Sequence, residues 1–430
     1  MTPSTEPGVI DELHRRGLIA QSTDEAALRA HLAEGPVAYY AGFDPTAQSL
    51  HVGHLLQFMV LRALQRAGHQ PVVLVGGATG LIGDPRPSAE RQLNDRDTVA
   101  SWVGRIREQV APFLDVPAET AGLKGPVYVN NLDWTAPVTA IDFLRDIGKH
   151  FRVSQMLAKE AVSARLNSEA GISYTEFSYQ ILQANDFREL HRRHAVTLQT
   201  GGSDQWGNLT AGIDLVRRTE GAKVHALSTP LVTKSDGTKF GKSEGGAVWL
   251  DPSLTSPYAF FQFWLNADDA DARMWLPLYS ERPAEELEAL IAESIARPAA
   301  RTAQRALAEE LTALVHGPDQ LRQAEAAGRA LFGREDLASL DAATLTAALE
   351  EAGAITVQGE LPTLAQLLQQ TGLVASLSEA RRTVKEGGAY LNNERVSDAD
   401  AVPPADAWLA GGWLVLRRGR RAIAGVRRGA

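Results

Sequence analysis

The sequence of 430 residues contains no cysteine. This absence excludes disulfides, cysteine-ligated zinc and thiol catalysis, and it suits a reducing cytoplasm, where we expect the protein to work. No apolar run approaches the ~20 residues needed to cross a bilayer, so we expect no membrane partner. The first residues include acidic side chains and lack the apolar core of a secretory signal.

Charge is unevenly distributed along the chain. The whole sequence has a formal net charge of −9, yet residues 361–430 hold ten Lys or Arg against six Asp or Glu, a net of +4. The preceding 360 residues therefore carry −13. A hydrophobic fraction of 44% and this length predict a globular protein of two or three domains. An acidic body with a small basic tail is compatible with a nucleic-acid partner.

Residues 43–54, FDPTAQSLHVGH, are the stretch around which the chain is organised. An apolar run of strand type precedes them, and apolar residues at helical spacing follow from His54 to Ala67. A strand, a sharp turn and a helix N-terminus form a natural anion site, at which His51 and His54 would lie. Gly53 would let another group approach the backbone. The alternatives are a capped helix start and an H-x-x-H metal site, but no third ligand cluster supports a metal.

A second strand-type run at residues 71–75 ends in the glycine-rich bend GGATGLIGDP. Strand, helix and strand within about forty residues predict a βαβ unit and a Rossmann-like parallel sheet, with ligands at the carboxyl ends of the strands. The G-x-G-x-x-G fingerprint is absent, so this fold does not imply nicotinamide chemistry.

Three further segments carry polar side chains in suggestive positions. On a helix, Tyr179, Gln183 and Asp186 share one face, which suits a small polar ligand or simply a solvated surface. A strand at residues 196–202 runs into GGSDQWGN, where Asp204 suits hydroxyl recognition, for example of a ribose. A predicted strand at residues 229–233 leads to a loop with three lysines and four glycines, either a lid over phosphates or a solvated loop.

The remaining chain predicts helices over residues 95–115 and 135–166, then three further regions. We expect an α/β catalytic domain at residues 1–255, an all-α domain at 256–350, a linker at 351–360 and a small α+β domain at 361–430. The last region groups basic side chains that suit phosphate contacts, although a merely soluble surface is the alternative. These side chains are Arg381, Arg382, Lys385, Arg417, Arg418, Arg420 and Arg421.

In their order and spacing, these motifs resemble the bacterial tyrosyl-tRNA synthetases over the whole chain. HVGH resembles the HIGH signature of class I synthetases, and KFGKS at residues 239–243 resembles their KMSKS loop. GGATGLIGDP, TEFSYQILQ and GGSDQWGN follow in the family's order, and the tail resembles an S4-type RNA-binding domain.

The resemblance implies a reaction in two steps. L-Tyrosine and ATP give tyrosyl-adenylate and pyrophosphate, and the tyrosyl group then passes to the 3′ end of tRNA(Tyr). ATP would be a substrate, with Mg²⁺ expected alongside it and no protein ligand assigned to the metal. The enzyme would be a homodimer, with residues 143–156 as a candidate contact.

The resemblance also implies roles for individual residues. The catalytic set would be His51, His54, Lys239, Lys242 and Ser243. Tyr40 and Asp186 would bind the phenol hydroxyl, Tyr179, Gln183 and Asp84 the α-ammonium group, and Gln205 the substrate carboxylate. ATP would contact Gly42, Asp44, His51, Gly53, His54, Gly202, Asp204 and Lys242, with Thr79 also lining the site. tRNA would contact Arg381, Arg382, Lys385, Arg417 and Arg418.

Some positions depart from the family pattern. Ala41 stands where Cys is common, Gln48 where Asp is common, and Asn185 where Tyr is frequent. The loop after Asp84 lacks the usual Gly-Lys, and its cationic contact would fall to Arg86 or Arg91. The competing functions are a tryptophanyl-tRNA synthetase, a small-molecule adenylyltransferase and a synthetase-like RNA-binding protein without catalysis.

Overall fold

A computed structural model describes the protein over residues 8–85, 93–114, 123–167, 171–238, 240–243, 246–332, 335–419 and 422–429, with the backbone alone at positions 160, 161, 242 and 243. The chain divides into two compact units. The first comprises Met1–Leu250 and Arg273–Glu288, and the second comprises Asp251–Ala272 and Ala289–Ala430. The first unit thus includes residues 273–288, which lie outside the catalytic domain expected at residues 1–255.

The first unit is built on a six-stranded sheet in the order β1-β6-β5-β2-β3-β4. Strands β2 to β6 run parallel, and only the short β1 is antiparallel, along β6. The chain passes from β2 outward to β3 and β4, and then crosses to β5 on the other side of β2. The crevice for a ligand in such a sheet lies where the order reverses, here at the carboxyl ends of β2 and β5. The strands are β1 (Gln21–Ser22), β2 (Ala38–Phe43), β3 (Gln70–Val75), β4 (Val127–Asn130), β5 (Val196–Gly202) and β6 (His225–Thr229).

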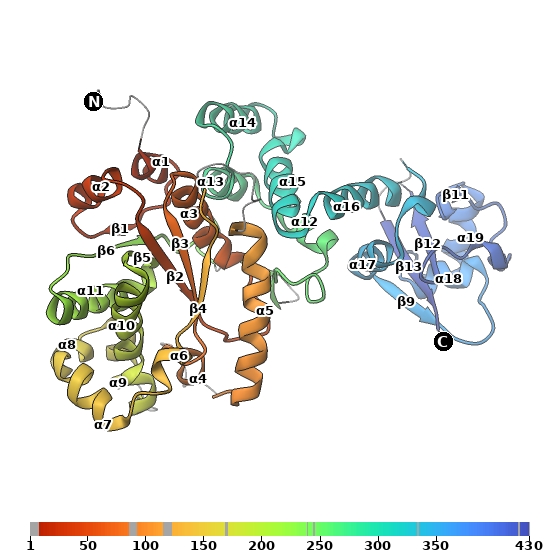
Figure 1. Cartoon of the computed structure of the whole chain (residues 1–430). Helices are drawn as coiled ribbons and strands as arrows, with labels where there is room; N and C mark the ends of the chain where they lie inside the picture. Colours follow the sequence, from red (N-terminus) through yellow and green to blue (C-terminus); the bar gives the residue numbers. More distant parts are fainter. Residues whose placement is uncertain are drawn as a thin grey trace. The chain divides into compact units, whose positions relative to one another are not determined.

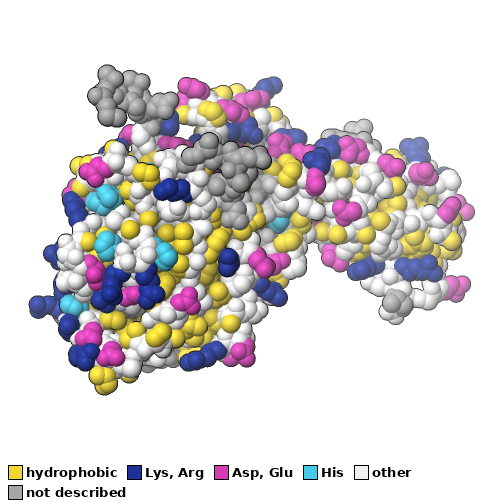
Figure 2. Space-filling view, viewed as in Figure 1, with side chains coloured by type: hydrophobic (Ala, Val, Ile, Leu, Met, Phe, Trp, Pro, Cys, Tyr) yellow, Lys and Arg dark blue, Asp and Glu magenta, His cyan; other side chains and the backbone are white. Residues whose placement is uncertain are grey.

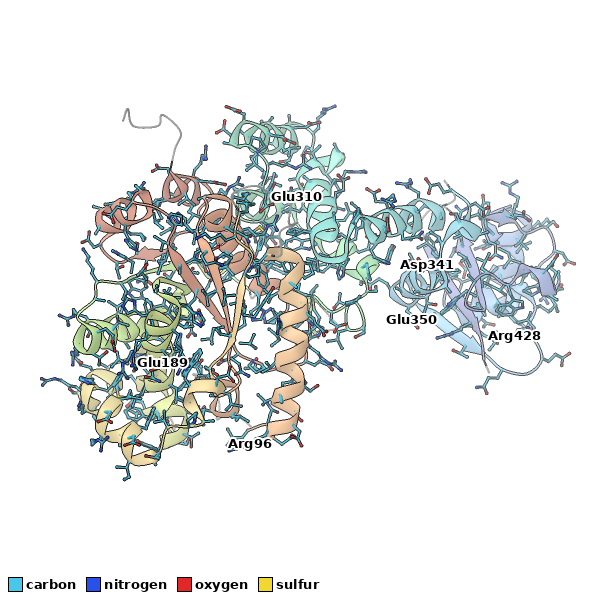
Figure 3. All side chains as sticks on the ribbon, viewed as in Figure 1. Arg96, Glu189, Glu310, Asp341, Glu350 and Arg428 are labelled. Carbon is cyan, nitrogen blue, oxygen red and sulfur yellow. The ribbon has the colours of Figure 1, made fainter. Side chains whose placement is uncertain are left out.

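Apolar patterning explains why these segments form a covered sheet. Five of the six residues of β3 are buried, as parallel strands with helices on both faces require. Helix α3 buries most of its length, and α10 and α11 pack together beside β5, while α5 runs along the β3–β4 side (Figure 1). Figure 3 labels Arg96 at the first residue of α5 and Glu189 on α10. The longer helices of this unit are α1 (Val9–Arg15), α2 (Glu25–Ala33), α3 (Leu55–Arg66), α5 (Arg96–Leu114), α10 (Tyr174–His194) and α11 (Trp206–Glu220).

Two local predictions need correction. The strand predicted at residues 229–233 is wrong, because the strand is β6 at His225–Thr229 and Pro230, which has no N–H to donate, follows it. The helix predicted over residues 135–166 is broken into short pieces, with a π-helical turn at Phe143–Ile147 followed by a 3-10 turn at Gly148–His150. The α-helical pieces here are α6 (Leu132–Thr135), α7 (Ala140–Asp142), α8 (Val153–Leu157) and α9 (Glu160–Leu166).

The second unit begins as a group of helices. Helix α12 packs against α15, α16 and α17, with Trp264 and Phe260 fully buried in α12. Asp341, labelled in Figure 3, caps α17 by accepting a hydrogen bond from the Thr344 backbone N–H at 2.7 Å. The helices are α12 (Pro257–Leu265), α15 (Thr302–His316), α16 (Pro318–Leu331) and α17 (Ala342–Ala352), while α13 (Asp269–Tyr279) and α14 (Ala284–Ala296) each have residues assigned to both units.

The second unit ends in a small α+β fold. Its sheet has the order β11-β10-β12-β13-β9, and α18 (Leu364–Gln370) and α19 (Leu377–Lys385) pack together beside it. The expected linker at residues 351–360 contains β9, which pairs in parallel with β13, because Ile355, Thr356 and Val357 are β-branched residues suited to a strand. The strands are β9 (Ala354–Val357), β10 (Ala389–Leu391), β11 (Glu394–Arg395), β12 (Trp413–Arg418) and β13 (Ala422–Arg428). Among the described residues, no helix has the length and hydropathy to span a membrane.

Candidate active site

A cavity of about 540 Å³ opens at the carboxyl ends of β2, β3 and β5, where the strand order reverses. All six residues expected to bind tyrosine line it, together with seven residues expected to bind ATP: Gly42, Asp44, His51, Gly53, His54, Gly202 and Asp204. The lining includes Tyr40, Gly42, Asp44, His51, Gly53, His54, Thr79, Asp84, Tyr179, Gln183, Asp186, Gly202, Asp204, Gln205 and Phe240. Lys239 and the side chains of Lys242 and Ser243 lie outside the described residues, as do Arg86 and Arg91.

One end of the cavity is closed by Asp186 of α10 and Tyr40 of β2. The carboxylate of Asp186 is buried and accepts hydrogen bonds from Asn131 Nδ2 at 3.0 Å and Trp134 Nε1 at 2.8 Å. Burial raises the pKa of Asp186 to about 7, although both donors oppose the rise. The Tyr40 hydroxyl is buried without a hydrogen-bond partner among the described residues, and its pKa is raised by burial and by the charge of Asp186.

This end can therefore receive a hydroxyl group. A buried hydroxyl without a partner is costly, and a ligand hydroxyl would accept a hydrogen bond from Tyr40 while donating one to Asp186. The sequence analysis did not identify Asn131 or Trp134. Their position directly after β4, at the same edge of the sheet as the other site residues, could have indicated them.

Asp44 connects the ends of two neighbouring strands. Its carboxylate accepts hydrogen bonds from the Tyr179 hydroxyl and from Thr79 Oγ1, each at 2.6 Å, and Thr79 in turn accepts one from Asn131 at 2.9 Å. A side chain at Gly76 would bring its Cβ within 2.0 Å of the Asp44 carboxylate, so the glycine-rich bend is what allows this contact. Because Tyr179 donates to Asp44, its oxygen remains an acceptor toward the cavity.

Three further acceptors belong to residues that line the same cavity. They are the Asp84 carboxylate, the Tyr179 oxygen and Gln183 Oε1, which has no partner among the described residues. Burial raises the pKa of Asp84, while hydrogen bonds from Gln205 and Asn208 lower it. Three acceptors, one of them anionic, suit a ligand ammonium group.

The HVGH segment leads directly into α3, with a 3-10 turn at Val52–His54. The rings of His51 and His54 lie 4.1 Å apart, and His51 Nδ1 accepts a hydrogen bond from the Gly53 backbone N–H at 3.1 Å. That bond assigns the hydrogen of a neutral His51 to Nε2. Burial lowers the pKa of His51, and it lowers that of His54 to about 3, with the charge of His51 adding to the effect. Both imidazoles are thus neutral near pH 7 and act as hydrogen-bond donors rather than cations.

The KFGKS segment is joined to HVGH by backbone hydrogen bonds. Val52 N–H donates to the carbonyl of Val248 at 3.0 Å, and Val248 N–H donates to the carbonyl of Gly241 at 3.0 Å. Phe240 packs against Trp275, with ring centroids 4.8 Å apart. The two signature segments therefore lie at the same side of the cavity, beside the N-terminus of α3.

The basic residues expected to contact tRNA differ in their availability. Arg381 is paired with Asp400 at 2.9 Å and Arg418 with Glu379 at 2.8 Å. Arg417 is only 8% exposed, and its guanidinium lies 4.1 Å from the ring centre of Tyr390. Arg382 and Lys385 are exposed on α19, whereas Arg420 and Arg421 lie outside the described residues.

Comparison with known proteins agrees with this geometry. Residues 32–333 match the family model described as tRNA synthetases class I (W and Y), and residues 345–424 match a tyrosine–tRNA ligase SYY-like C-terminal domain. The tyrosine–tRNA ligase of Streptomyces griseus is 62% identical over 97% of this chain and 98% of its own. That of Acidothermus cellulolyticus is 60% identical over 98% of this chain and 99% of its own.

A solved structure gives the same result for the fold. A C-terminally truncated mitochondrial tyrosyl-tRNA synthetase of Aspergillus nidulans is 29% identical, with a TM-score of 0.68 over 76% of this chain and 95% of its own. The matched family model covers strands β2 to β6, the cavity and both signature segments. The chain therefore belongs to the class I tRNA synthetases of the tryptophan and tyrosine group.

Proposed function

We propose that the protein is an ATP-dependent tyrosine–tRNA ligase. It activates L-tyrosine with ATP to tyrosyl-adenylate and pyrophosphate, and then transfers the tyrosyl group to the 3′ end of tRNA(Tyr). The observation that carries the proposal is the buried Asp186 carboxylate beside the Tyr40 hydroxyl, which has no hydrogen-bond partner in the described part of the chain.

This pair selects among aromatic side chains. A phenol hydroxyl satisfies both groups, because it donates to Asp186 and accepts from Tyr40. An indole N–H can donate to Asp186 but leaves Tyr40 without a partner. Phenylalanine offers neither group a hydrogen bond, so Tyr40 stays unpaired among the described residues and Asp186 keeps only its bonds from Asn131 and Trp134. Each buried group left unpaired costs about 1–3 kcal/mol, and more if it is charged.

The polar half of the cavity holds the reacting groups. Asp84, Tyr179 and Gln183 bind the α-ammonium group, and Gln205 faces the carboxylate. A carboxylate oxygen attacks the α-phosphorus, the bond from that phosphorus to pyrophosphate breaks, and no protein nucleophile is needed. A hydroxyl of the terminal tRNA ribose then attacks the tyrosyl carbonyl and displaces AMP.

The phosphates lie at the N-terminus of α3. His51 and His54 donate hydrogen bonds there, Lys239 and Lys242 supply positive charge and Ser243 supports them, while Gly42, Gly53, Gly202 and Asp204 hold the nucleoside. Charge on the phosphates grows in the transition state, so loss of either imidazole should lower kcat more than it raises KM for ATP. Mg²⁺ enters with ATP; the described residues hold no cluster of three or more His, Cys, Asp or Glu for a metal.

Tyrosine-dependent exchange of pyrophosphate into ATP tests the proposal. We expect exchange with tyrosine but not with tryptophan or phenylalanine, and its loss or strong weakening in Asp186→Ala. Asp319→Ala, which changes an exposed aspartate on α16, serves as the matched control. Exchange with tryptophan in place of tyrosine would show that the enzyme is specific for tryptophan. No exchange with any amino acid, from a folded protein that still binds tRNA, would indicate an RNA-binding function instead.

The macromolecular arrangement completes the proposal. The basic C-terminal fold binds tRNA(Tyr), and the substrates ATP and tRNA place the enzyme in the cytoplasm. We propose a homodimer through the segment from α7 to α9, which carries exposed apolar side chains: Ile141 is 70%, Val153 60%, Leu144 52% and Leu157 37% exposed. Figure 2 shows hydrophobic side chains among charged ones on the surface of the first unit. Val153→Glu is expected to give monomers in analytical ultracentrifugation, and an unchanged dimer would place the contact elsewhere.

A further inference from the structure

A series of hydrogen-bonded polar side chains connects Asp84 to Lys159. Gln205 Nε2 donates to Asp84 Oδ2 at 3.0 Å, and Asn208 Nδ2 donates to Asp84 Oδ1 at 3.3 Å and to Gln205 Oε1 at 2.8 Å. Lys159 Nζ donates to Asn208 Oδ1 at 2.6 Å. Asn208 and Lys159 are not among the residues that line the cavity.

We propose that Lys159 is a positioning residue for the α-ammonium site: through Asn208 it fixes the direction in which two side-chain amides face Asp84. The inference rests on the proposed function, because it gives Asp84 the substrate ammonium as its ligand.

The argument follows from what each group can donate. A lysine ammonium has donors and no acceptor, so the atom of Asn208 that faces it must be the oxygen. The Asn208 amide nitrogen then faces Asp84 and Gln205 Oε1. Since Gln205 accepts there, its own nitrogen must face Asp84. One lysine thus sets the orientation of both amides, and a flipped Asn208 would instead place an oxygen against the carboxylate.

The residues around Lys159 leave space for its side chain and influence its pKa. A side chain at Gly207 would bring its Cβ within 3.0 Å of Lys159 Cε, so this glycine of the GGSDQWGN motif leaves the room that the lysine occupies. Burial lowers the pKa of Lys159 to about 7, and the charge of Asp84 opposes that change. The charge of Lys159 in turn lowers the pKa of Asp84, which burial and Asp204 raise.

A positioning role and a purely electrostatic role for Lys159 predict opposite effects on tyrosine binding. The ammonium of Lys159 repels the ammonium of the substrate, so a lysine acting through charge alone would weaken tyrosine binding, and its removal would tighten it. A lysine that orients the two amides strengthens binding, and its removal weakens it.

The test compares three phenols that differ in their charged groups. Binding of tyrosine, tyramine (which keeps the ammonium) and 3-(4-hydroxyphenyl)propionate (which lacks it) is measured by calorimetry for wild type and Lys159→Met. We expect tyrosine and tyramine to bind about 10- to 150-fold more weakly in the variant, as loss of one charge-assisted hydrogen bond implies, with the propionate changed less than about twofold. Lys159→Arg should restore most of the affinity, and Lys124→Met, at an exposed lysine outside the site and the proposed dimer contact, is the matched control.

Several outcomes would overturn the inference. If all three ligands bind equally more weakly, Lys159 only supports the packing of the site. If tyrosine binding is unchanged or tighter, Lys159 does not position the amides. Asn208→Leu breaks the same connection without touching Lys159, so it should reproduce the pattern and keeps the test decisive if Lys159→Met does not fold. The double variant should bind tyrosine no more weakly than Asn208→Leu alone. A wild-type protein that binds none of the phenols and shows no exchange would instead refute the proposed function.

Discussion

Replacing Trp134 by phenylalanine tests how the phenol end of the cavity works. The substitution removes the Nε1–H that donates to Asp186 at 2.8 Å and keeps an aromatic ring at a site that is only 4% exposed. Asn131 would remain as the second donor to the carboxylate.

The magnitude follows from the carboxyl group's pKa. A hydrogen bond to a charged group contributes about 1.5–3 kcal/mol, and 1.36 kcal/mol corresponds to one pKa unit, so the pKa of Asp186 should rise from about 7 by about one to two. At pH 7.5 about three quarters of the wild-type carboxyl groups are ionised, against about one tenth if the pKa is 8.5. The ionised form is the acceptor that the phenol hydroxyl needs. We therefore expect kcat/KM for tyrosine to fall about 3- to 25-fold at pH 7.5.

The assay is tyrosine-dependent pyrophosphate exchange between pH 6 and 9, because kcat/KM reports ionisations of the free enzyme. Protonation of Asp186 removes the acceptor as pH falls, so kcat/KM should decline below a midpoint near 7 in the wild type and below a higher midpoint in the variant, with partial recovery by pH 9. Trp413→Phe is the control, since Trp413 is a buried tryptophan that donates to Thr346 at 2.8 Å outside the site. An unshifted midpoint in Trp134→Phe would refute the reasoning.

Three further predictions concern the second unit. Burial lowers the pKa of His316 to about 4, below its ordinary 6.5, so the unfolded chain binds the proton more readily and stability is lost as pH falls from 6.5 toward 4. Between pH 7.5 and 5, the free energy of unfolding measured in urea should therefore fall by about 2 kcal/mol more for the wild type than for His316→Phe. An equal fall in both proteins would contradict this prediction. A chain ending just before β9 should keep pyrophosphate exchange and lose tRNA charging; a folded truncation that loses both activities equally would show that the C-terminal fold is needed for activation. Arg382→Ala and Lys385→Ala should each raise KM for tRNA. Each should also reduce the slope of log affinity against log salt concentration by roughly 0.7–0.9 per lost phosphate contact. Arg381→Ala should have a smaller effect because Arg381 is paired with Asp400. Equal effects of all three substitutions in charging assays would argue against that ranking.

The sequence was sufficient to predict which segments meet at the site. The segments beginning at Asp44, Gly76 and Gly202 each follow an apolar run, and parallel strands end at one edge of a sheet. The helical spacing of Tyr179, Gln183 and Asp186 likewise indicated one shared face, and the structure places all three at the cavity. Local patterns of this kind are readable because strand and helix periods depend on neighbouring residues.

The pairing of side chains was decided only by the tertiary structure. Asn131 and Trp134 contact Asp186 across more than fifty positions of sequence, and Tyr179 donates to Asp44 across 135. The placement of β9 in the C-terminal sheet, where a linker was expected, also depends on a distant strand. The amino-acid sequence by itself determined the βαβ core of the first unit, the family motifs and the edge of the sheet that carries them. Strand order and side-chain packing decided which polar groups are buried together, because burial and hydrogen-bond partners arise from residues that lie far apart along the chain.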